Sequence, residues 1–302
     1  MESAFLLTGG FLSSSQPLCI SRTCRPIVDS QDRVVAVFAG RPKGDNWDAL
    51  MKRAAEEIEQ TRGQIRPKNS TRGKFPSAEF GFGHGGGRKK PSNVHQPSAT
   101  ALARLTGLLM LQCFQSLVGF ANCIFQAYAP ETHAYYWGCM QKLRGWDPSL
   151  CSLFSDSVFA SYTVNFGPVT VSHPHTDSAN LSFGWCAITA LGRFDPDKGG
   201  HLILWDLNLI IRFPPGSTIL IPSALLTHSN TPIQDGEFRY SFVQYSAAAL
   251  FRWVYNGFQS DADFEATAAP EQRAKREEDR QKRWRDGVNM FSKWTDLRTQ
   301  KQ

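Results

Sequence analysis

Several common functional signatures are missing from this chain of 302 residues. It has neither a GxxxxGK(S/T) loop nor a GxGxxG that follows a predicted strand, which argues against a nucleotide cofactor. It has no GxSxG, which argues against an α/β-hydrolase. Its seven cysteines include no C-x-x-C pair, so zinc and redox motifs of that type are excluded. We expect free thiols in a reducing compartment.

Long apolar runs are missing as well. Polar residues at near-helical spacing interrupt the most apolar stretch, residues 105–127, and no run of 18 apolar residues exists. The pattern predicts a half-buried core helix. Near the start, Glu2 occupies a position where a secretory signal would carry positive charge. We therefore expect a soluble intracellular protein with no membrane partner.

Charge is only modestly unbalanced. Lysine and arginine number 33 against 27 acidic residues, which gives a net charge of +6. A basic balance is compatible with a nucleic-acid partner without establishing one. The basic segment 61–91 contains GFGHGGGRKKP. Its composition favours a solvated loop, and the alternative is a phosphate-contacting loop whose glycines allow close backbone approach.

Hydrophobic periodicity divides the chain into an irregular segment at 1–30, a domain at 31–260 and a charged helical tail at 261–302. A strand at 33–40 precedes helical support over 45–143, with helices at 45–60, 98–128 and 131–143, the first capped by Asp45. The β core is expected at 155–258, where the period changes to two, as in the alternating run 203–213. This order predicts an α+β fold, a β-barrel or sandwich with helices packed on one sheet.

The segment HPHTDSAN, residues 173–180, holds two of the chain's seven histidines beside an aspartate. His175 and Asp177 stand at positions i and i+2, so on an extended strand both side chains face one way. His228, 51 residues after Asp177, is the best candidate for a third ligand. Two histidines and one carboxylate make a facial triad that suits Fe(II) and leaves three positions open. His173 is the alternative ligand.

Arg239 and Ser241, in FRYSF, also stand at i and i+2. They are predicted to face the barrel interior, while the alternating aromatic residues Phe238, Tyr240 and Phe242 face the other side. Such a pair can hold a carboxylate, the arginine through a bidentate ion pair. A dicarboxylate such as 2-oxoglutarate could bind iron with its keto-acid end and reach this pair with the other. Asn180 has two interpretations, an Asx turn or a hydrogen bond to the cosubstrate or substrate.

These segments resemble the fungal TET/JBP-like branch of the Fe(II)/2-oxoglutarate-dependent dioxygenases. The resemblance is clearest over residues 155–258, through NFGPVTVSHPHTD, FPPGSTILIPSALLTHSN, FRYSFVQY and LFRWVYNGF. It implies a double-stranded β-helix, also called a jelly roll or cupin barrel. It also implies that His175, Asp177 and His228 bind iron, and that Arg239 anchors the distal carboxylate of 2-oxoglutarate.

The resemblance further implies a DNA substrate, a 5-methylpyrimidine flipped into the pocket, with basic segments 62–74 and 88–90 holding the backbone. The chain departs from its relatives in two features that bear on the substrate: it has no cysteine-rich zinc module, and Ala247–Ala249 stand where relatives tend to have glycine.

We predict that the protein is an Fe(II)- and 2-oxoglutarate-dependent dioxygenase that acts in the nucleus as a monomer. It would use dioxygen to hydroxylate the methyl group of 5-methylcytosine or thymine in DNA. The alternatives are the same chemistry on a protein or small molecule, and a catalytically inactive, transposon-associated DNA-binding barrel.

Overall fold

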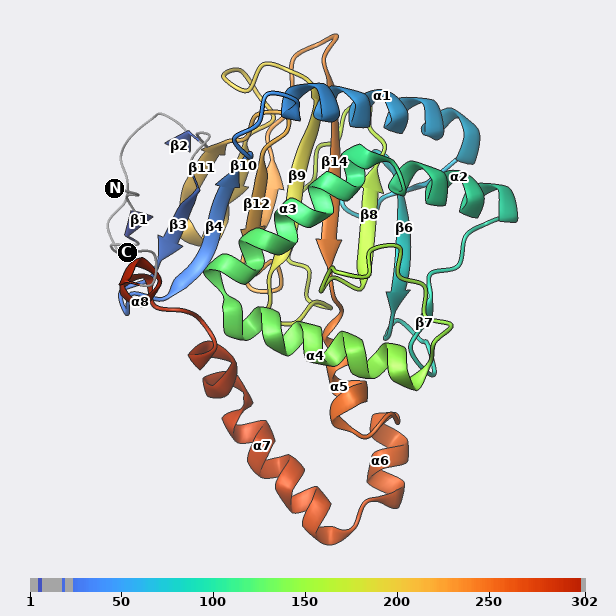
Figure 1. The fold of residues 1–302 in the computed structure, drawn as a ribbon, viewed down its shortest axis with the longest axis vertical. Coiled ribbons are helices and arrows are strands. Elements are labelled where there is room, and N and C mark those ends of the chain that lie inside the picture. Colours follow the sequence, from blue (N-terminus) through green and yellow to red (C-terminus); the bar gives the residue numbers. More distant parts are fainter. Residues whose placement is uncertain (1–4, 7–17, 20–23, 300–302) are drawn as a thin grey trace.

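The computed structural model describes residues 5–6, 18–19 and 24–299 (Figure 1). Its strands form two sheets. The larger sheet has the order β1 (Phe5–Leu6), β3 (Arg25–Val28), β4 (Val34–Gly40), β12 (Thr218–Ile221), β9 (Cys186–Arg193), β14 (Phe238–Tyr245), β8 (Ser161–Asn165), β6 (Pro76–Gly83) and β5 (Lys68–Asn69), and β7 (Ser92–Asn93) pairs with β6. The smaller sheet has the order β13 (His228–Asn230), β10 (Leu202–Leu204), β11 (Leu209–Arg212) and β2 (Leu18–Cys19).

The two sheets pack face to face. Apolar side chains from both sheets form one core cluster, which includes Phe38, Ile219, Leu204 and Ile211. Most neighbouring strands of the larger sheet run antiparallel, among them the central β9 and β14. Two facing, largely antiparallel sheets with helices on one of them make an α+β double-stranded β-helix, as predicted.

Helices cover the outer face of the larger sheet (Figure 1). They are α1 (Trp47–Ile65), α2 (Ala99–Leu109), α3 (Gln112–Tyr128) and α4 (Pro130–Trp146). Their apolar sides form a second core cluster with even-numbered residues of β14, Tyr240 and Phe242. The odd-numbered residues Arg239 and Ser241 therefore face the space between the sheets, as the period of two predicts.

The C-terminal part leaves the barrel and returns to it. Helices α5 (Ala248–Tyr255), α6 (Asp261–Thr267) and α7 (Pro270–Asn289) project away from the sheets (Figure 1), and α8 (Trp294–Thr299) lies beside β3. Asp32 holds α8 by accepting hydrogen bonds from the backbone of Trp294 and Thr295. Helix α7 is exposed and carries ion pairs at helical spacing, such as Lys275–Asp279, which confirms the predicted charged helix.

Several expectations about local structure are wrong. The helix expected at 98–128 is broken at Met110 and Leu111 into α2 and α3, which are bent by 66°. Leu111 has extended backbone angles, and after the break α2 packs mainly on α1, whereas α3 packs on α1, β4 and β12. The alternating run 203–213 is a hairpin, because a 3₁₀ turn at Trp205–Leu207 and left-handed Asn208 reverse the chain between β10 and β11.

The basic segment 61–91 also differs from a plain loop. It contains β5 and β6, and β6 pairs with β8 in the larger sheet. Consequently GFGHGG, residues 81–86, does place a GxGxxG spacing at the end of a strand. The next helix is α2, which begins only at Ala99, so the strand–turn–helix context of a dinucleotide site is missing.

Two expectations near the N-terminus are also wrong. Arg25–Val28 form β3 inside the segment expected to be irregular, and Asp45 does not cap α1, whose N-cap is Asn46.

No single helix in the described ranges is long and apolar enough to span a membrane, although α2 and α3 together, as a bent pair, reach that length and apolarity.

Five described cysteines are free thiols, as expected: Cys113, Cys123, Cys139, Cys151 and Cys186. Cys19 has a side chain outside the described part of the chain.

Gly184 offers a test of how tightly the helices pack on the barrel. A Cβ atom at this position would lie 1.8 Å from the hydroxyl oxygen of buried Tyr136 on α4. We expect Gly184→Ala to lower the free energy of unfolding by about 2–4 kcal/mol, because the core must shift to admit the methyl group. The control is Gly138→Ala on α4, the helix that carries Tyr136, where a new Cβ would meet nothing within 4 Å. For this variant we expect the free energy of unfolding to rise by up to ~1 kcal/mol. Urea unfolding of both variants measures the difference, and equal stabilities would contradict this packing.

Candidate active site

Backbone pairing brings the two candidate histidine ligands together. His175 lies in the segment between β8 and β9, and His228 opens β13. The amide of His175 donates to the carbonyl of His228 at 3.1 Å, and the amide of His228 donates back at 2.9 Å. This isolated antiparallel bridge places the two ring centroids 4.3 Å apart. Two segments far apart in the sequence thus present their imidazoles side by side.

The carboxylate of Asp177 completes the group. The amide of Asp177 donates to the carbonyl of Ser223 at 2.8 Å, which fixes the backbone. Its Oδ1 lies 3.6 Å from Nε2 of His175, and its Oδ2 lies 3.8 Å from Nε2 of His228. One ligand atom from each of the three residues lies within 4.8 Å of the others, a spacing that can hold a metal ion.

The hydrogen bonds of both rings prepare them as ligands. Nδ1 of His175 lies 2.7 Å from the carbonyl oxygen of His173, and Nδ1 of His228 lies 2.9 Å from that of Leu226. A carbonyl only accepts, so each Nδ1 carries the proton and each Nε2 keeps a free lone pair toward Asp177. Burial, followed by the neighbouring His228, lowers the pKa of His175 and so favours the neutral, metal-binding form.

A cavity of about 660 Å³ contains this triad and extends to Arg239 and Ser241. Arg239 is 1% exposed, and its Nη1 donates to the carbonyl of Thr170 at 2.8 Å. Its Nε and Nη2 have no hydrogen-bond partner in the described part of the chain. Burial lowers the pKa of this guanidinium to about 10, so it stays charged at neutral pH. A buried cation with two unused N–H groups on one edge fits a carboxylate ligand.

The donor set therefore fits both groups that the sequence implies. Two imidazoles and a carboxylate suit Fe(II) and leave coordination positions open. The unused edge of Arg239 suits the distal carboxylate of 2-oxoglutarate. Ser241 lies beside it, and its Oγ accepts a hydrogen bond from Nδ2 of Asn165 at 2.8 Å, which leaves the hydroxyl proton of Ser241 available to a ligand.

The other predicted site residues are placed as follows. Asn180 lines the cavity, but its backbone closes a turn onto the carbonyl of Asp177 and its Nδ2 donates to Oγ of Ser223 at 3.2 Å. His173 is exposed and contributes only its carbonyl oxygen to His175, so its ring stays outside the triad. The ring of His201 also lies outside the triad, because its Nε2 bonds to the carbonyl of Pro196 at 2.9 Å.

Arg72 is a site residue whose position the sequence does not reveal. The sequence places it only within the basic segment 62–74, yet its Nη2 lies 3.2 Å from Oδ1 of Asp177, 105 residues away. The carbonyl of Arg72 accepts a hydrogen bond from the amide of His173 at 2.8 Å. At the next position, a Cβ on Gly73 would lie 2.3 Å from the carbonyl oxygen of Val171. Close backbone approach therefore seats this segment beside the triad.

We expect Arg72→Gln to weaken Fe(II) binding by about 10-fold, because groups that orient a ligating carboxylate typically contribute that much to metal affinity. Lys74→Gln is the matched control, since Lys74 is exposed, belongs to the same segment and does not line the cavity. Metal titration of both variants provides the measurement. Equal affinities in Arg72→Gln and Lys74→Gln would show that the Arg72–Asp177 contact does not orient the carboxylate.

No protein-family model and no curated protein matches this chain. Solved structures similar to it include NgTET1 in complex with 5mC DNA, with 15% sequence identity, a TM-score of 0.48, and coverage of 82% of this chain and 83% of that chain. An oxidoreductase of the 2OG-Fe(II) oxygenase family from Burkholderia pseudomallei has 15% identity, a TM-score of 0.35, and coverage of 63% and 76%. OsALKBH1 has 12% identity, a TM-score of 0.37, and coverage of 70% and 96%. These likenesses concern the path of the chain, and the chemistry of the site rests on its own residues.

Proposed function

We propose that this protein is an Fe(II)- and 2-oxoglutarate-dependent dioxygenase that hydroxylates the methyl group of a methylated nucleobase, 5-methylcytosine or thymine, in DNA. One observation carries the oxygenase: the triad of His175, Asp177 and His228 shares a single cavity with the buried, incompletely bonded Arg239. The carbonyl of Thr170 and the ring of Phe194 contact this guanidinium, but no acid pairs with it in the described residues, and burial makes such a cation unfavourable unless a ligand supplies the opposite charge.

The triad would hold iron and Arg239 would hold 2-oxoglutarate. Iron with this cosubstrate supplies the oxidising chemistry, in which dioxygen is consumed and 2-oxoglutarate is converted to succinate and carbon dioxide. Arg239 and the Ser241 hydroxyl bind the distal carboxylate and so orient the keto-acid end toward the triad. Apolar side chains of the same cavity, Ile188, Leu202 and Val243, exclude water from the cosubstrate.

The remaining lining of the cavity supports a nucleic-acid substrate. Lys68, Arg72 and Arg88 line it and can contact phosphates, which attract lysine and arginine regardless of sequence. A methyl group inside a duplex is out of reach of a triad within a cavity, so the base must be flipped out. Action in the nucleus as a monomer belongs to this proposal, and the narrower kinship with the fungal branch stays a prediction.

The decisive experiment incubates the protein with methylated DNA, Fe(II), ascorbate and 2-oxoglutarate, and analyses the nucleosides by mass spectrometry. We expect 5-methylcytosine or thymine to decrease, a hydroxymethyl product to appear, and succinate to form in proportion to that product. Succinate release that methylated DNA does not stimulate, in protein with full metal occupancy, would point instead to a protein or small-molecule substrate. Full occupancy without succinate from any substrate would point to an inactive barrel.

A further inference from the structure

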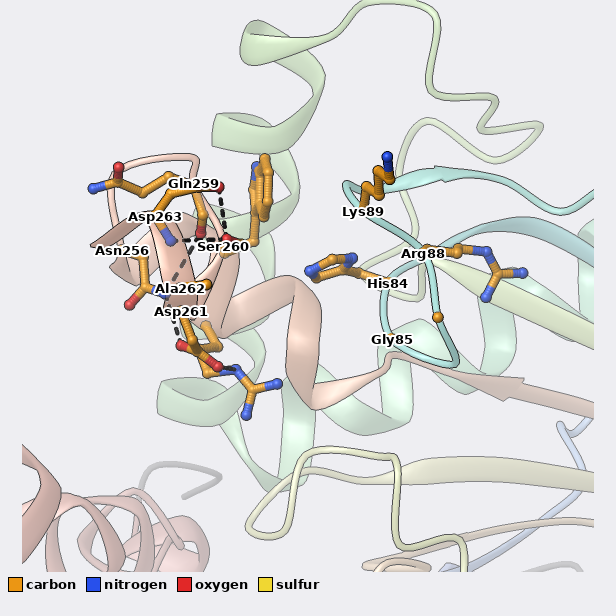
Figure 2. Close-up of a pocket in the computed structure, with 13 residues that line it drawn as sticks. His84, Gly85, Arg88, Lys89, Asn256, Gln259, Ser260, Asp261, Ala262 and Asp263 are labelled. Atoms are coloured by element: carbon orange, nitrogen blue, oxygen red, sulfur yellow. Dashed lines mark hydrogen bonds and ion pairs between the residues drawn. The ribbon is translucent and has the colours of Figure 1, made fainter. Parts of the chain in front are cut away.

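A second cavity, of about 580 Å³, lies outside the candidate active site, and Figure 2 shows how its acidic side chains are used. The glycine-rich turn after β6 forms one wall, and the end of α5 with the start of α6 forms the other. Asp261 forms ion pairs with Arg252 and Arg276, and Asp263 accepts a hydrogen bond from the hydroxyl of Ser260 at 2.6 Å. Both acids therefore have partners within the protein.

The main cavity differs, because its one described acid besides Asp177 has no such partner. This acid is Glu79, which lies on β6 and is exposed at the cavity wall. Its backbone is held, since its carbonyl accepts a hydrogen bond from Nε2 of Gln96 at 2.6 Å. Within the described ranges its carboxylate forms neither an ion pair nor a hydrogen bond, although three basic side chains line the same cavity. A carboxylate only accepts hydrogen bonds, so it is available to a ligand that donates one.

The register of the larger sheet turns Glu79 toward the inside of the barrel. Glu79 pairs with Thr163 on β8, and Thr163 pairs with Val243 on β14. Side chains directly opposite one another on neighbouring strands share a face, and Thr163 and Val243 both line the main cavity. The next residue, Phe80, belongs to the core beneath the helices, so Glu79 faces the other way, toward the space between the sheets.

The row of side chains that contains Glu79 lies beside the row that would hold the cosubstrate. Ser241 pairs with Asn165, and Asn165 pairs with Ser77, which stands two residues before Glu79. Two residues along a strand span about 7 Å, and β6 lies two strands, about 10 Å, from β14. Glu79 is therefore far enough from Arg239 and Ser241 not to repel the distal carboxylate of 2-oxoglutarate.

Glu79 faces the same part of the cavity as the triad. Burial raises the pKa of Tyr245, and the charges of Glu79 and, less strongly, of Asp177 raise this pKa further. Tyr245 lines the cavity, so both carboxylates lie within electrostatic reach of one hydroxyl inside it. A substrate that brings a reacting atom to the triad consequently lies beside Glu79.

The charge of Glu79 decides which part of a nucleotide it can contact. A carboxylate repels phosphate groups, which suit the basic side chains Lys68, Arg72 and Arg88 of the same cavity. The base edge is the part of a nucleotide that offers uncharged hydrogen-bond donors. The partner of Glu79 is therefore the base that enters the cavity.

We propose that Glu79 selects the substrate base by accepting a hydrogen bond from its exocyclic amino group. This inference rests on the proposed function, and it narrows the substrate to 5-methylcytosine. The N4 amino group of cytosine donates, and acidic side chains are suited to accept from it. Thymine carries the acceptor O4 at that position, and its N3–H is flanked by two carbonyl oxygens that a carboxylate repels.

Glu79→Gln tests the proposal with little change in shape. The glutamine amide can donate to O4 of thymine as well as accept from N3–H, so the variant should admit thymine. Glu56→Gln on α1 is the matched control, since Glu56 is exposed, forms no ion pair in the described part of the chain and does not line the cavity. Each variant loses one negative charge, and a general gain in DNA affinity cancels in a ratio between two bases.

The readout is this ratio for two duplexes that differ only in the target base, 5-methylcytosine or thymine, and contain no other 5-methylpyrimidine. The target stands opposite an abasic site, so no base pair has to open before it leaves the stack. Fluorescence anisotropy measures affinity in metal-free protein, and mass spectrometry measures kcat/KM in iron-loaded protein. We expect wild type and Glu56→Gln to prefer 5-methylcytosine by about tenfold or more, and Glu79→Gln to lose this preference.

The outcomes separate this inference from the proposed function. Oxidation with the same preference in wild type and Glu79→Gln, or with a wild-type preference for thymine, would overturn the role of Glu79 and keep the oxygenase. A preference in affinity that Glu79→Gln removes, without oxidation of either base, would keep the role of Glu79 and refute the proposed reaction. No oxidation and equal affinity for both bases would overturn both.

Discussion

Arg239→Met is expected to raise the KM for 2-oxoglutarate by about 100-fold or more while Fe(II) binding stays intact. Arg239 is fully buried, and its Nε and Nη2, which have no hydrogen-bond partner in the described residues, can neutralise a distal carboxylate in this cavity. Removing one partner of a buried, hydrogen-bonded charge pair typically weakens binding by about 2–5 kcal/mol, which is about 30-fold to several thousand-fold.

The stability of the same variant provides an independent test. Burial lowers the pKa of Arg239 to about 10, which means that the folded protein without cosubstrate disfavours the charged form. At neutral pH the guanidinium is still charged, so this unfavourable contribution is present and methionine removes it. We expect the Tm of the cosubstrate-free variant not to fall, and the rise in Tm that 2-oxoglutarate causes in wild type to disappear.

Arg193→Met is the matched control for Arg239→Met. Arg193 lies on β9 opposite Phe238, next to Arg239 in the register, but its side chain is exposed and rests over the Phe238 ring at 5.5 Å. Its KM for 2-oxoglutarate should equal that of wild type. An unchanged KM in Arg239→Met, or an equal rise in both variants, would remove Arg239 from the cosubstrate site.

His228→Ala is expected to weaken Fe(II) binding by more than about 100-fold and to abolish succinate formation. The loss leaves one histidine and one carboxylate, whereas even groups that only orient a ligand change metal affinity by about 10–100-fold. Metal content after dialysis and succinate release measure the two effects.

His201→Ala is the control for His228→Ala. His201 precedes β10, the strand that pairs with β13, and its ring bonds to the carbonyl of Pro196. Its metal affinity should match wild type. Because His228 is 5% exposed, circular dichroism and thermal unfolding must show that His228→Ala remains folded. Metal retention at wild-type affinity in folded His228→Ala would contradict the triad.

Local spacing was enough to predict part of the site. His175 and Asp177, like Arg239 and Ser241, stand two residues apart, and the geometry of an extended chain puts such pairs on one face whatever the rest of the protein does. The alternation along β14 likewise predicted which side faces the helices, and Tyr240 and Phe242 lie there. These features depend only on bond geometry and on near neighbours.

Other features follow from contacts between distant segments. The break at Met110 and Leu111 contains no proline or glycine, and it separates α2, which packs mainly on α1, from α3, which also packs on β4 and β12. Arg72 meets Asp177 across 105 residues because β5 and β6 join the larger sheet and carry their loop to the triad. The second cavity forms only where the turn after β6 meets α5 and α6.

The chemistry available to this protein can be read from its residues alone: two imidazoles, a carboxylate and a guanidinium, at spacings that put neighbouring pairs on one face of an extended chain. That these groups share one cavity follows only from the folded arrangement. The paired amides of His175 and His228, and the burial of Arg239 with Nε and Nη2 unpaired in the described residues, are set by sheet order and register. The strand order and the pairing register that form are those with the lowest free energy for the whole core, so no local stretch of sequence encodes them.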